Sequence, residues 1–148
     1  MRRLAVGVCI IVLLAASLLI GYYVYMQPRT ATIEFAGVRL TVELATTPAA
    51  QEQGLSGRDS MPADHGMLFV FNQEAQWGFW MHEMRFPLDI IWFNAQRQVV
   101  FMEQDLSPCT PTACPVYSPS VNALYVLEVN AGFVRANGVG LGESFTFV

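Results

Sequence analysis

The sequence predicts a mostly β, α+β domain, a compact barrel-like sheet with two short helices, behind one N-terminal transmembrane helix. Three observations predict this fold class. Short apolar segments separated by turn residues recur along most of the chain, which is typical of a sandwich or barrel. Some of them, such as "MLFVF" and "DIIWF", are apolar at consecutive positions, as expected of strands that are covered on both faces. A long uncharged segment precedes them.

This N-terminal segment, Leu4 to Met26, contains no charged residue. As a helix rising about 1.5 Å per residue it would be roughly 34 Å long, enough to cross a bilayer. Arg2 and Arg3 precede it, and the positive-inside rule then keeps the amino end in the cytoplasm. The alternative is a cleaved signal peptide, but bulky "YYVYMQ" stands where small residues are needed for cleavage.

We therefore expect residues 1–27 to be a transmembrane anchor (or signal peptide) that contacts the lipid bilayer through residues 4–26. The protein would be a single-pass cell-membrane protein with an extracytoplasmic domain, or a secreted one after cleavage. Residues 28–32 would be a short linker, and residues 33–148 the β-rich domain.

The domain begins with two segments, "TIEF" and "VRLTVEL", that alternate about Ala36-Gly37, a pattern typical of a β-hairpin. Their expected inward-facing residues are Ile33, Phe35, Leu40, Val42 and Leu44. A short helix should follow, because Thr47 is a good N-cap, Pro48 suits the first helical position and Gly54 is a stop signal.

Further strands are expected at "GMLFVF", "WGFWM", "LDIIWFN", "QVVFME", "NALYVLEV" and "ESFTFV". The segment "DLSPCTPTACPVYSPS" is rich in proline and predicts a loop, whereas "AGFVRANG" predicts a short helix ending in glycine.

The charge excludes one class of partner. From residue 28 onward the chain has six Arg, no Lys and twelve acidic residues, so six minus twelve gives a formal charge of −6. Nucleic acids and anionic lipids need clustered cations, and no nucleic-acid partner is expected. The sequence also lacks a Gly-rich phosphate loop, a GxSxG elbow and an HExxH motif. We expect no cofactor and, on balance, no enzyme.

The segment "FWMHEM" contains Met81, His82 and Met84, and thioether with imidazole is a ligand set suited to copper. However, consecutive strand residues point to opposite faces, so Met81 and His82 could share an ion only if the strand were bulged or ended there. We therefore predict packing rather than a metal site, and keep copper as the alternative.

Asp89 lies in the apolar segment "PLDIIWF". Strand alternation places it on the face of Ile91 and Phe93, and a buried carboxylate needs hydrogen bonds or a cation. Arg58 and Arg85 are the candidate partners. We expect Arg58 and Asp89 to meet at the rim of the barrel beside a pocket, as a salt bridge that fixes a loop, as a pair that orients a ligand or as a catalytic pair.

Cys109 and Cys114, in "CTPTAC", are expected to form a disulfide in an exported loop, with Cys9 left in the apolar segment. The ring is small, so the gain in stability would be roughly 2 kcal/mol. A redox-active dithiol is the alternative, but the C-x-x-C spacing typical of one is missing.

Five motifs, QGL…R, GMLFVF, FWM, PLDI and PC…CP…Y, follow one another between about Ile33 and Val148. Together they resemble the domain of unknown function 192 family. The resemblance implies a small, mostly β domain, often exported behind an anchor, and supplies no established activity. Arg58 and Asp89 match signature positions of that family. His82, Glu83 and Met84 depart from its usual segment, so a copper site would be special to this chain.

The function predicted is therefore that of an extracytoplasmic, membrane-anchored domain that binds a small ligand or an envelope partner without catalysis. Its mouth would be lined by Arg58, Trp80, His82, Asp89 and Tyr117. The alternative is an extracytoplasmic enzyme, or a redox or copper-handling protein that uses Cys109 and Cys114 or Met81, His82 and Met84.

Overall fold

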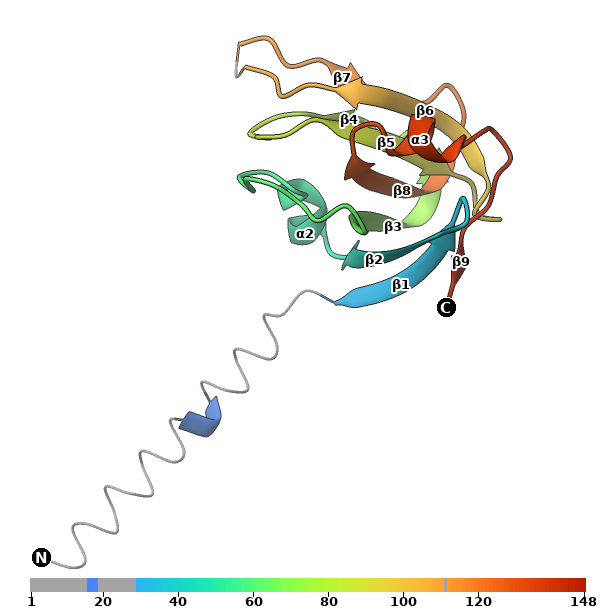
Figure 1. Ribbon diagram of the computed structural model, residues 1–148. Helices are drawn as coiled ribbons and strands as arrows, with labels where there is room; N and C mark the ends of the chain where they lie inside the picture. The colour runs from blue at the N-terminus through green and yellow to red at the C-terminus, as the bar shows by residue number, and fades with distance from the viewer. Residues whose placement is uncertain (1–15, 19–28, 111) are drawn as a thin grey trace, which may run out of the picture.

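In a computed structural model of the chain, the described residues are 16–18, 29–110 and 112–148. Residues 16–18 are helical and exposed. The remaining elements, in chain order, are β1 (Thr30–Phe35), β2 (Val38–Ala45), α2 (Pro48–Gln53), β3 (His65–Ala75), β4 (Phe79–Trp80), β5 (Leu88–Phe93), β6 (Val99–Leu106), β7 (Val116–Tyr117), β8 (Ala123–Asn130), α3 (Phe133–Asn137) and β9 (Thr146–Phe147). Figure 1 shows their arrangement.

The mostly β class predicted from the sequence is confirmed, with short helices beside the sheets. Seven strands form one sheet in the order β6-β5-β8-β3-β2-β1-β9, and β4 and β7 form a separate two-stranded sheet. Neighbouring strands of the large sheet are antiparallel except β2 and β3, which are parallel and are connected through α2.

The predicted barrel-like sheet does not close into a barrel, because the large sheet ends at β6 on one side and at β9 on the other. The sheet curves enough for the start of β6 to approach the segment before β9, where the Val99 N–H donates to the Glu143 carbonyl (2.8 Å). The Gly142 N–H donates to the Val99 carbonyl and the Phe145 N–H to the Arg97 carbonyl. The bridge between Gln98 and Ser144 is the one isolated β-bridge there among the described residues. β9 is two residues long and pairs with β1 instead, so the two edges do not close.

Local chemistry explains the first elements. The hairpin between β1 and β2 turns at Ala36 and Gly37, both with positive φ, which suits a tight hairpin turn. In α2 the Thr47 hydroxyl accepts a hydrogen bond from the Ala50 N–H (3.2 Å), and Pro48 is the first residue. The predicted hairpin and helix are confirmed, although β1 starts at Thr30 and so extends into the segment predicted to be a linker.

The large sheet separates two apolar clusters. The first cluster contains the predicted inward-facing residues of β1 and β2, together with Ile91 and Phe93 of β5 and Val134 of α3. The second cluster lies on the other face, with Ile90 and Trp92, and extends to Leu55 and Met81. All six residues of β5 are buried, which agrees with the prediction that this strand is covered on both faces.

No helix among residues 16–18, 29–110 and 112–148 is long and apolar enough to span a membrane. The predicted anchor, residues 4–26, lies outside the described residues apart from 16–18.

Candidate functional site

The predicted pair of Arg58 and Asp89 is wrong. Arg58 donates instead to both carboxylate oxygens of Glu43, at 2.5 and 2.8 Å. Glu43 lies on the face of the sheet that carries Met67, Glu128 and Ile90, which are its successive cross-strand neighbours, while Asp89 belongs to the adjacent row with Val129, Gly66 and Val42. Adjacent rows point to opposite faces, so the two predicted partners belong to different sides of the sheet.

Asp89 has a structural environment of its own. Its side chain is fully buried, and its two carboxylate oxygens accept hydrogen bonds from the backbone N–H groups of Asp105 and Val134, both at 2.8 Å. Val134 is in the first turn of α3, whose own N-cap residue, Gly132, provides no side-chain acceptor. Asp89 therefore caps this helix from a neighbouring strand. Arg85, the other predicted partner, pairs with exposed Asp59.

Trp80 and His82, two other predicted site residues, do lie together. Their ring centroids are 5.2 Å apart, and both border a hollow of about 430 Å³ whose remaining lining residues are Ala49, Glu52, Gln53, Ser56 and Glu83. Tyr117 pairs with Phe79 between β7 and β4 and packs against the second apolar cluster.

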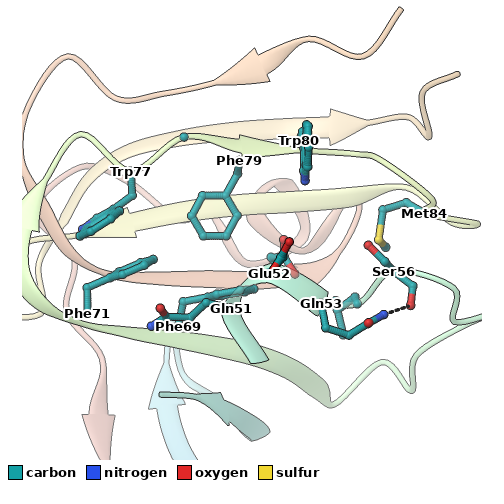
Figure 2. A pocket seen from close by; sticks show the side chains of 14 residues that line it. Gln51, Glu52, Gln53, Ser56, Phe69, Phe71, Trp77, Phe79, Trp80 and Met84 are labelled. Carbon is teal, nitrogen blue, oxygen red and sulfur yellow. Dashed lines mark hydrogen bonds between the residues drawn. The ribbon is translucent and has the colours of Figure 1, made fainter. Parts of the chain in front are cut away.

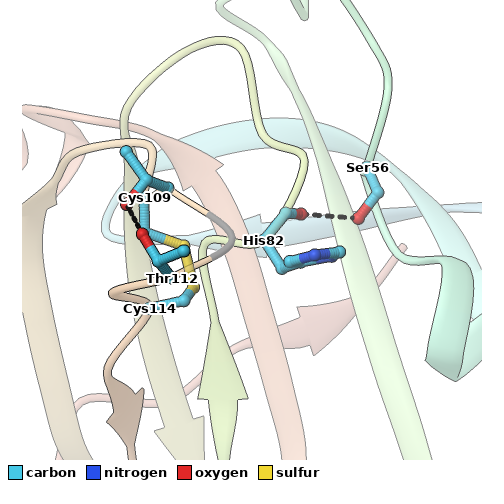
Figure 3. The surroundings of a disulfide bond; sticks show 6 residues. Ser56, His82, Cys109, Thr112 and Cys114 are labelled. Atoms are coloured by element: carbon cyan, nitrogen blue, oxygen red, sulfur yellow. Dashed lines mark hydrogen bonds between the residues drawn. A yellow bond between two sulfur atoms is a disulfide. The ribbon is translucent and has the colours of Figure 1, made fainter.

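The predicted disulfide is confirmed, with Cys109 and Cys114 bonded and their Cα atoms 5.0 Å apart. Figure 3 shows it beside the turn that carries His82. The Cys109 N–H donates to the Met81 carbonyl (3.4 Å), and on the other side of this turn the Ser56 hydroxyl donates to the His82 carbonyl (3.0 Å). The disulfide loop thus supports the segment that follows β4.

The two methionines of the copper alternative pack in an apolar cluster, and its histidine lies beside an aromatic ring. Met81 is fully buried in the second apolar cluster, Met84 is 8% exposed in the same cluster, and His82 packs on Trp80. Within the described part of the chain, no group of three or more His, Cys, Asp or Glu residues could hold a metal ion.

A cavity of about 250 Å³ adjoins the hollow beside Trp80 and His82, and shares Glu52, Gln53, Ser56 and Trp80 with it. We call the two together the α2–β4 cleft. Figure 2 shows Trp77, Phe79 and Trp80 on one wall, facing Gln51, Glu52 and Gln53 of α2 with Phe69 and Phe71 of β3. The other lining residues of the cavity are Gly54, Leu55, Gly78, Met84 and Glu128.

The aromatic side chains of this cleft pack closely on one another. Phe71 stacks on Trp77 with ring centroids 3.9 Å apart, and Phe69 meets Phe79 edge to face at 4.8 Å. Trp80 is 52% exposed despite its size. The indole N–H of Trp77 is buried and has no acceptor among the described residues.

Glu128 is the residue that the sequence analysis missed. It lies in β8, is 5% exposed and lines the cavity, and its Oε2 atom is buried without a hydrogen-bond partner in the described part of the chain. Burial raises the pKa of this carboxyl to about 8, against the opposing effect of the positive charge of Arg58. In "NALYVLEV" Glu128 lies two residues after Val126 and therefore shares its strand face. A carboxyl group on an apolar strand face was the pattern that drew attention to Asp89, and it was present here as well.

The Arg58–Glu43 ion pair lies on the same face of the sheet as Glu128, with β3 between their strands. The hydrogen bonds from Arg58 lower the pKa of the Glu43 carboxyl. Both hydrogen bonds of the Arg58 guanidinium go to Glu43, so Arg58 acts on Glu128 through its charge alone. The site therefore combines a paired carboxylate with a buried, unpaired carboxyl at an aromatic cleft.

Comparisons with known proteins agree with the fold. The model of the family DUF192, described as "Uncharacterized ACR", matches residues 31–147. A crystal structure from Sinorhizobium meliloti, described as that of a candidate transcription regulator, is 29% identical with a TM-score of 0.76, covering 82% of this chain and 96% of that one. A Novosphingobium aromaticivorans protein of unknown function is 29% identical with a TM-score of 0.70, covering 81% and 85%. No functionally curated protein matches.

Proposed function

The chain belongs to the DUF192 family, and from this premise we propose that it is a membrane-anchored, extracytoplasmic domain that binds a small ligand in the α2–β4 cleft without transforming it. The single observation that carries the proposal is Glu128, a buried carboxyl that lines a cavity and lacks a hydrogen-bond partner within the described residues. Folded proteins pair nearly all of their buried polar groups, so an exception at a cavity indicates a group that a ligand completes.

The lining of the cleft supports binding rather than catalysis. Its hydroxyl group, on Ser56, donates to the carbonyl of His82 and not to the imidazole ring. Nucleophilic catalysis needs a base within hydrogen-bond reach of the nucleophile. No such pair is found among the described residues that line the cleft.

The proposed location of the domain rests on the apolar segment near the N-terminus and on the disulfide. Residues 4–26 are long and apolar enough to cross a bilayer, and Arg2 and Arg3 favour a cytoplasmic amino end. Disulfides persist mainly in oxidising compartments, which is consistent with the bonded Cys109 and Cys114 outside the cytoplasm.

A role in transcription, suggested by the Sinorhizobium meliloti protein, is not proposed for this chain. DNA binding depends on Lys and Arg that neutralise phosphates. Residues 28–148 carry a formal charge of −6, and three of their six arginines are paired with carboxylates, namely Arg58, Arg85 and Arg135.

The test is a thermal-shift screen of the full-length chain in detergent against a library of small metabolites. Compounds that bind in the cleft should raise the melting temperature of the wild type but not of Trp80→Ala, which removes an exposed wall of the cleft. Phe147→Ala is the matched control, because Phe147 is similarly exposed (45%) but lies in β9. A library without hits, or hits that survive Trp80→Ala, would contradict the proposal.

A further inference from the structure

On the premise of the proposed function, we infer that the ligand of the α2–β4 cleft is a small organic cation, a compound with an ammonium group that Glu128 pairs with and the aromatic side chains surround. The inference rests on the charges that line the cleft, on the engagement of the nearest arginine and on the rings themselves.

Apart from His82, the ionisable side chains that line the cleft are carboxyl groups. Glu52 and Glu128 line the cavity, and Glu52 and Glu83 line the adjoining hollow. No Arg or Lys is among the described lining residues of either part. An anionic ligand would face three carboxyl groups and no Arg or Lys, whereas a cationic ligand could pair with these carboxyl groups.

The charged groups of the surrounding elements do not neutralise Glu128. Arg58 approaches from the loop after α2, but it makes two hydrogen bonds with Glu43 of β2. Glu103 of β6 faces the same side of the sheet, since it pairs across from Ile90, which in turn pairs with Glu128. His65 of β3 is on this face too and contacts Asp64 (2.8 Å). Among the described residues, Arg58 is therefore the one cation that acts on Glu128, and its hydrogen bonds go to Glu43.

The cavity wall is suited to an ammonium group. Phe69, Phe71, Trp77, Phe79 and Trp80 all line it, and the electron-rich faces of such rings attract cations, most strongly where water is excluded. Met84 adds a polarisable thioether. A cavity of about 250 Å³ is at the small end of ligand sites, which favours a compact compound over an oligosaccharide or a peptide.

Binding should be coupled to the release of a proton. Burial raises the pKa of Glu128 to about 8, so below this pH the empty cleft holds a neutral carboxyl. When a cation binds, the O–H bond of Glu128 breaks, the proton leaves to solvent and the carboxylate pairs with the ammonium group. Below pH 8 the affinity should therefore rise about tenfold per pH unit, and above it the affinity should level off.

Choline and its neutral isostere 3,3-dimethyl-1-butanol form a matched pair of probes for the full-length chain. Isothermal titration calorimetry between pH 6 and 9 should detect choline binding that strengthens with pH up to about 8, while the isostere binds at least 30-fold more weakly. Equal binding of the two would overturn the inference and leave ligand binding intact. Failure of choline to bind would also overturn it, and the metabolite screen would then decide separately whether the cleft binds neutral ligands.

Glu128→Gln tests the role of the carboxyl, and Glu103→Gln is its matched control on the same face of the sheet, because Glu103 does not line the cleft. We expect Glu128→Gln to weaken choline binding at pH 8 at least 30-fold and to abolish its pH dependence, and Glu103→Gln to change the affinity by less than threefold. A Glu128→Gln variant that is folded by circular dichroism and binds choline like the wild type would overturn the inference.

Discussion

Asp89 and Glu128 are two buried carboxyl groups on neighbouring strands, and they differ in their hydrogen-bond partners and in how their faces of the sheet are covered. Asp89 of β5 is next to Ile90, the cross-strand partner of Glu128 in β8, so the two side chains leave the sheet close together but on opposite faces. Asp89 accepts two backbone hydrogen bonds, whereas Glu128 Oε2 has no partner in the described part of the chain. Burial alone does not distinguish these two carboxyl groups, but their hydrogen-bond partners do.

The two faces are also closed in different ways. On the face of Asp89, α3 packs directly on the sheet, and the residue at its first turn bonds to the carboxylate. On the face of Glu128, α2 and the β4–β7 sheet leave a cavity between them. An unpaired buried carboxyl lowers stability, and proteins tolerate such losses mainly at functional sites.

The largest effect is expected from Asp89→Ala. The substitution leaves the N–H groups of Asp105 and Val134 without acceptors in a buried site, and each such loss costs about 1–3 kcal/mol. We expect the free energy of unfolding to fall by about 4 kcal/mol in total, measured by guanidinium denaturation of the full-length chain in detergent. Asp89→Asn should fall between Asp89→Ala and the wild type, because its amide oxygen can replace only one acceptor. A loss below 1 kcal/mol for Asp89→Ala would remove the basis of the comparison.

Glu128→Gln should act in the opposite direction. The pKa of this carboxyl rises from 4.5 to about 8 in the folded protein. The folded state therefore keeps a proton that the unfolded state loses, and the resulting contribution to the free energy of unfolding is fully present below pH 4.5 and is lost as the pH rises through about 8. Each pH unit in that interval changes the free energy of unfolding by about 1.4 kcal/mol.

Between pH 5 and 7 the wild type should therefore lose about 3 kcal/mol relative to Glu128→Gln. Denaturation curves of both proteins at half-unit pH steps measure the difference. If the two curves stay parallel across this range, Glu128 is not a buried, unpaired carboxyl in solution, and the contrast with Asp89 disappears.

Asp89 shows which parts of a site can be predicted from the sequence and which cannot. Alternation along β5 correctly placed Asp89 with Ile91 and Phe93, because the face of a strand residue follows from the period of two. Its partners could not be found in this way, because they are backbone groups of Asp105 and Val134, positioned by the packing of distant segments. Arg58 was predicted as the partner because its side chain is charged, but backbone N–H groups can also donate hydrogen bonds to a carboxylate.

Other features also divide into those that are local in sequence, which could be predicted, and those that depend on tertiary contacts, which could not. The hairpin at Ala36-Gly37, the cap at Thr47 and the disulfide are local in sequence, and all were predicted. Whether the sheet closes depends on pairing between its two ends, and the distance between these ends in the fold is not encoded in any short motif. The cleft likewise arises from α2 and β4, which meet only in the tertiary structure.

The smallest effect is expected from Arg58→Met, which sharpens the comparison by removing the charge nearest to Glu128. The Arg58 side chain is 37% exposed and Glu43 22%, so solvent screening limits the loss of stability to about 1 kcal/mol. Arg58 lowers the pKa of Glu43, and stability from a lowered pKa is present above pH 4.5 and is lost as the pH falls through the folded value. The deficit of the variant should therefore shrink in acid.

Arg58 also lowers the pKa of Glu128 against the effect of burial. Removing Arg58 should therefore raise the upper limit, the pH at which stability stops falling because of Glu128, above 8. Denaturation of Arg58→Met beside Arg58→Met/Glu128→Gln measures this pH. Arg85→Met is the control, because Arg85 pairs with exposed Asp59 and should change stability by less than 0.5 kcal/mol at any pH. An upper limit that does not move would mean that Glu43 already cancels the charge of Arg58, which would leave burial alone to keep Glu128 protonated.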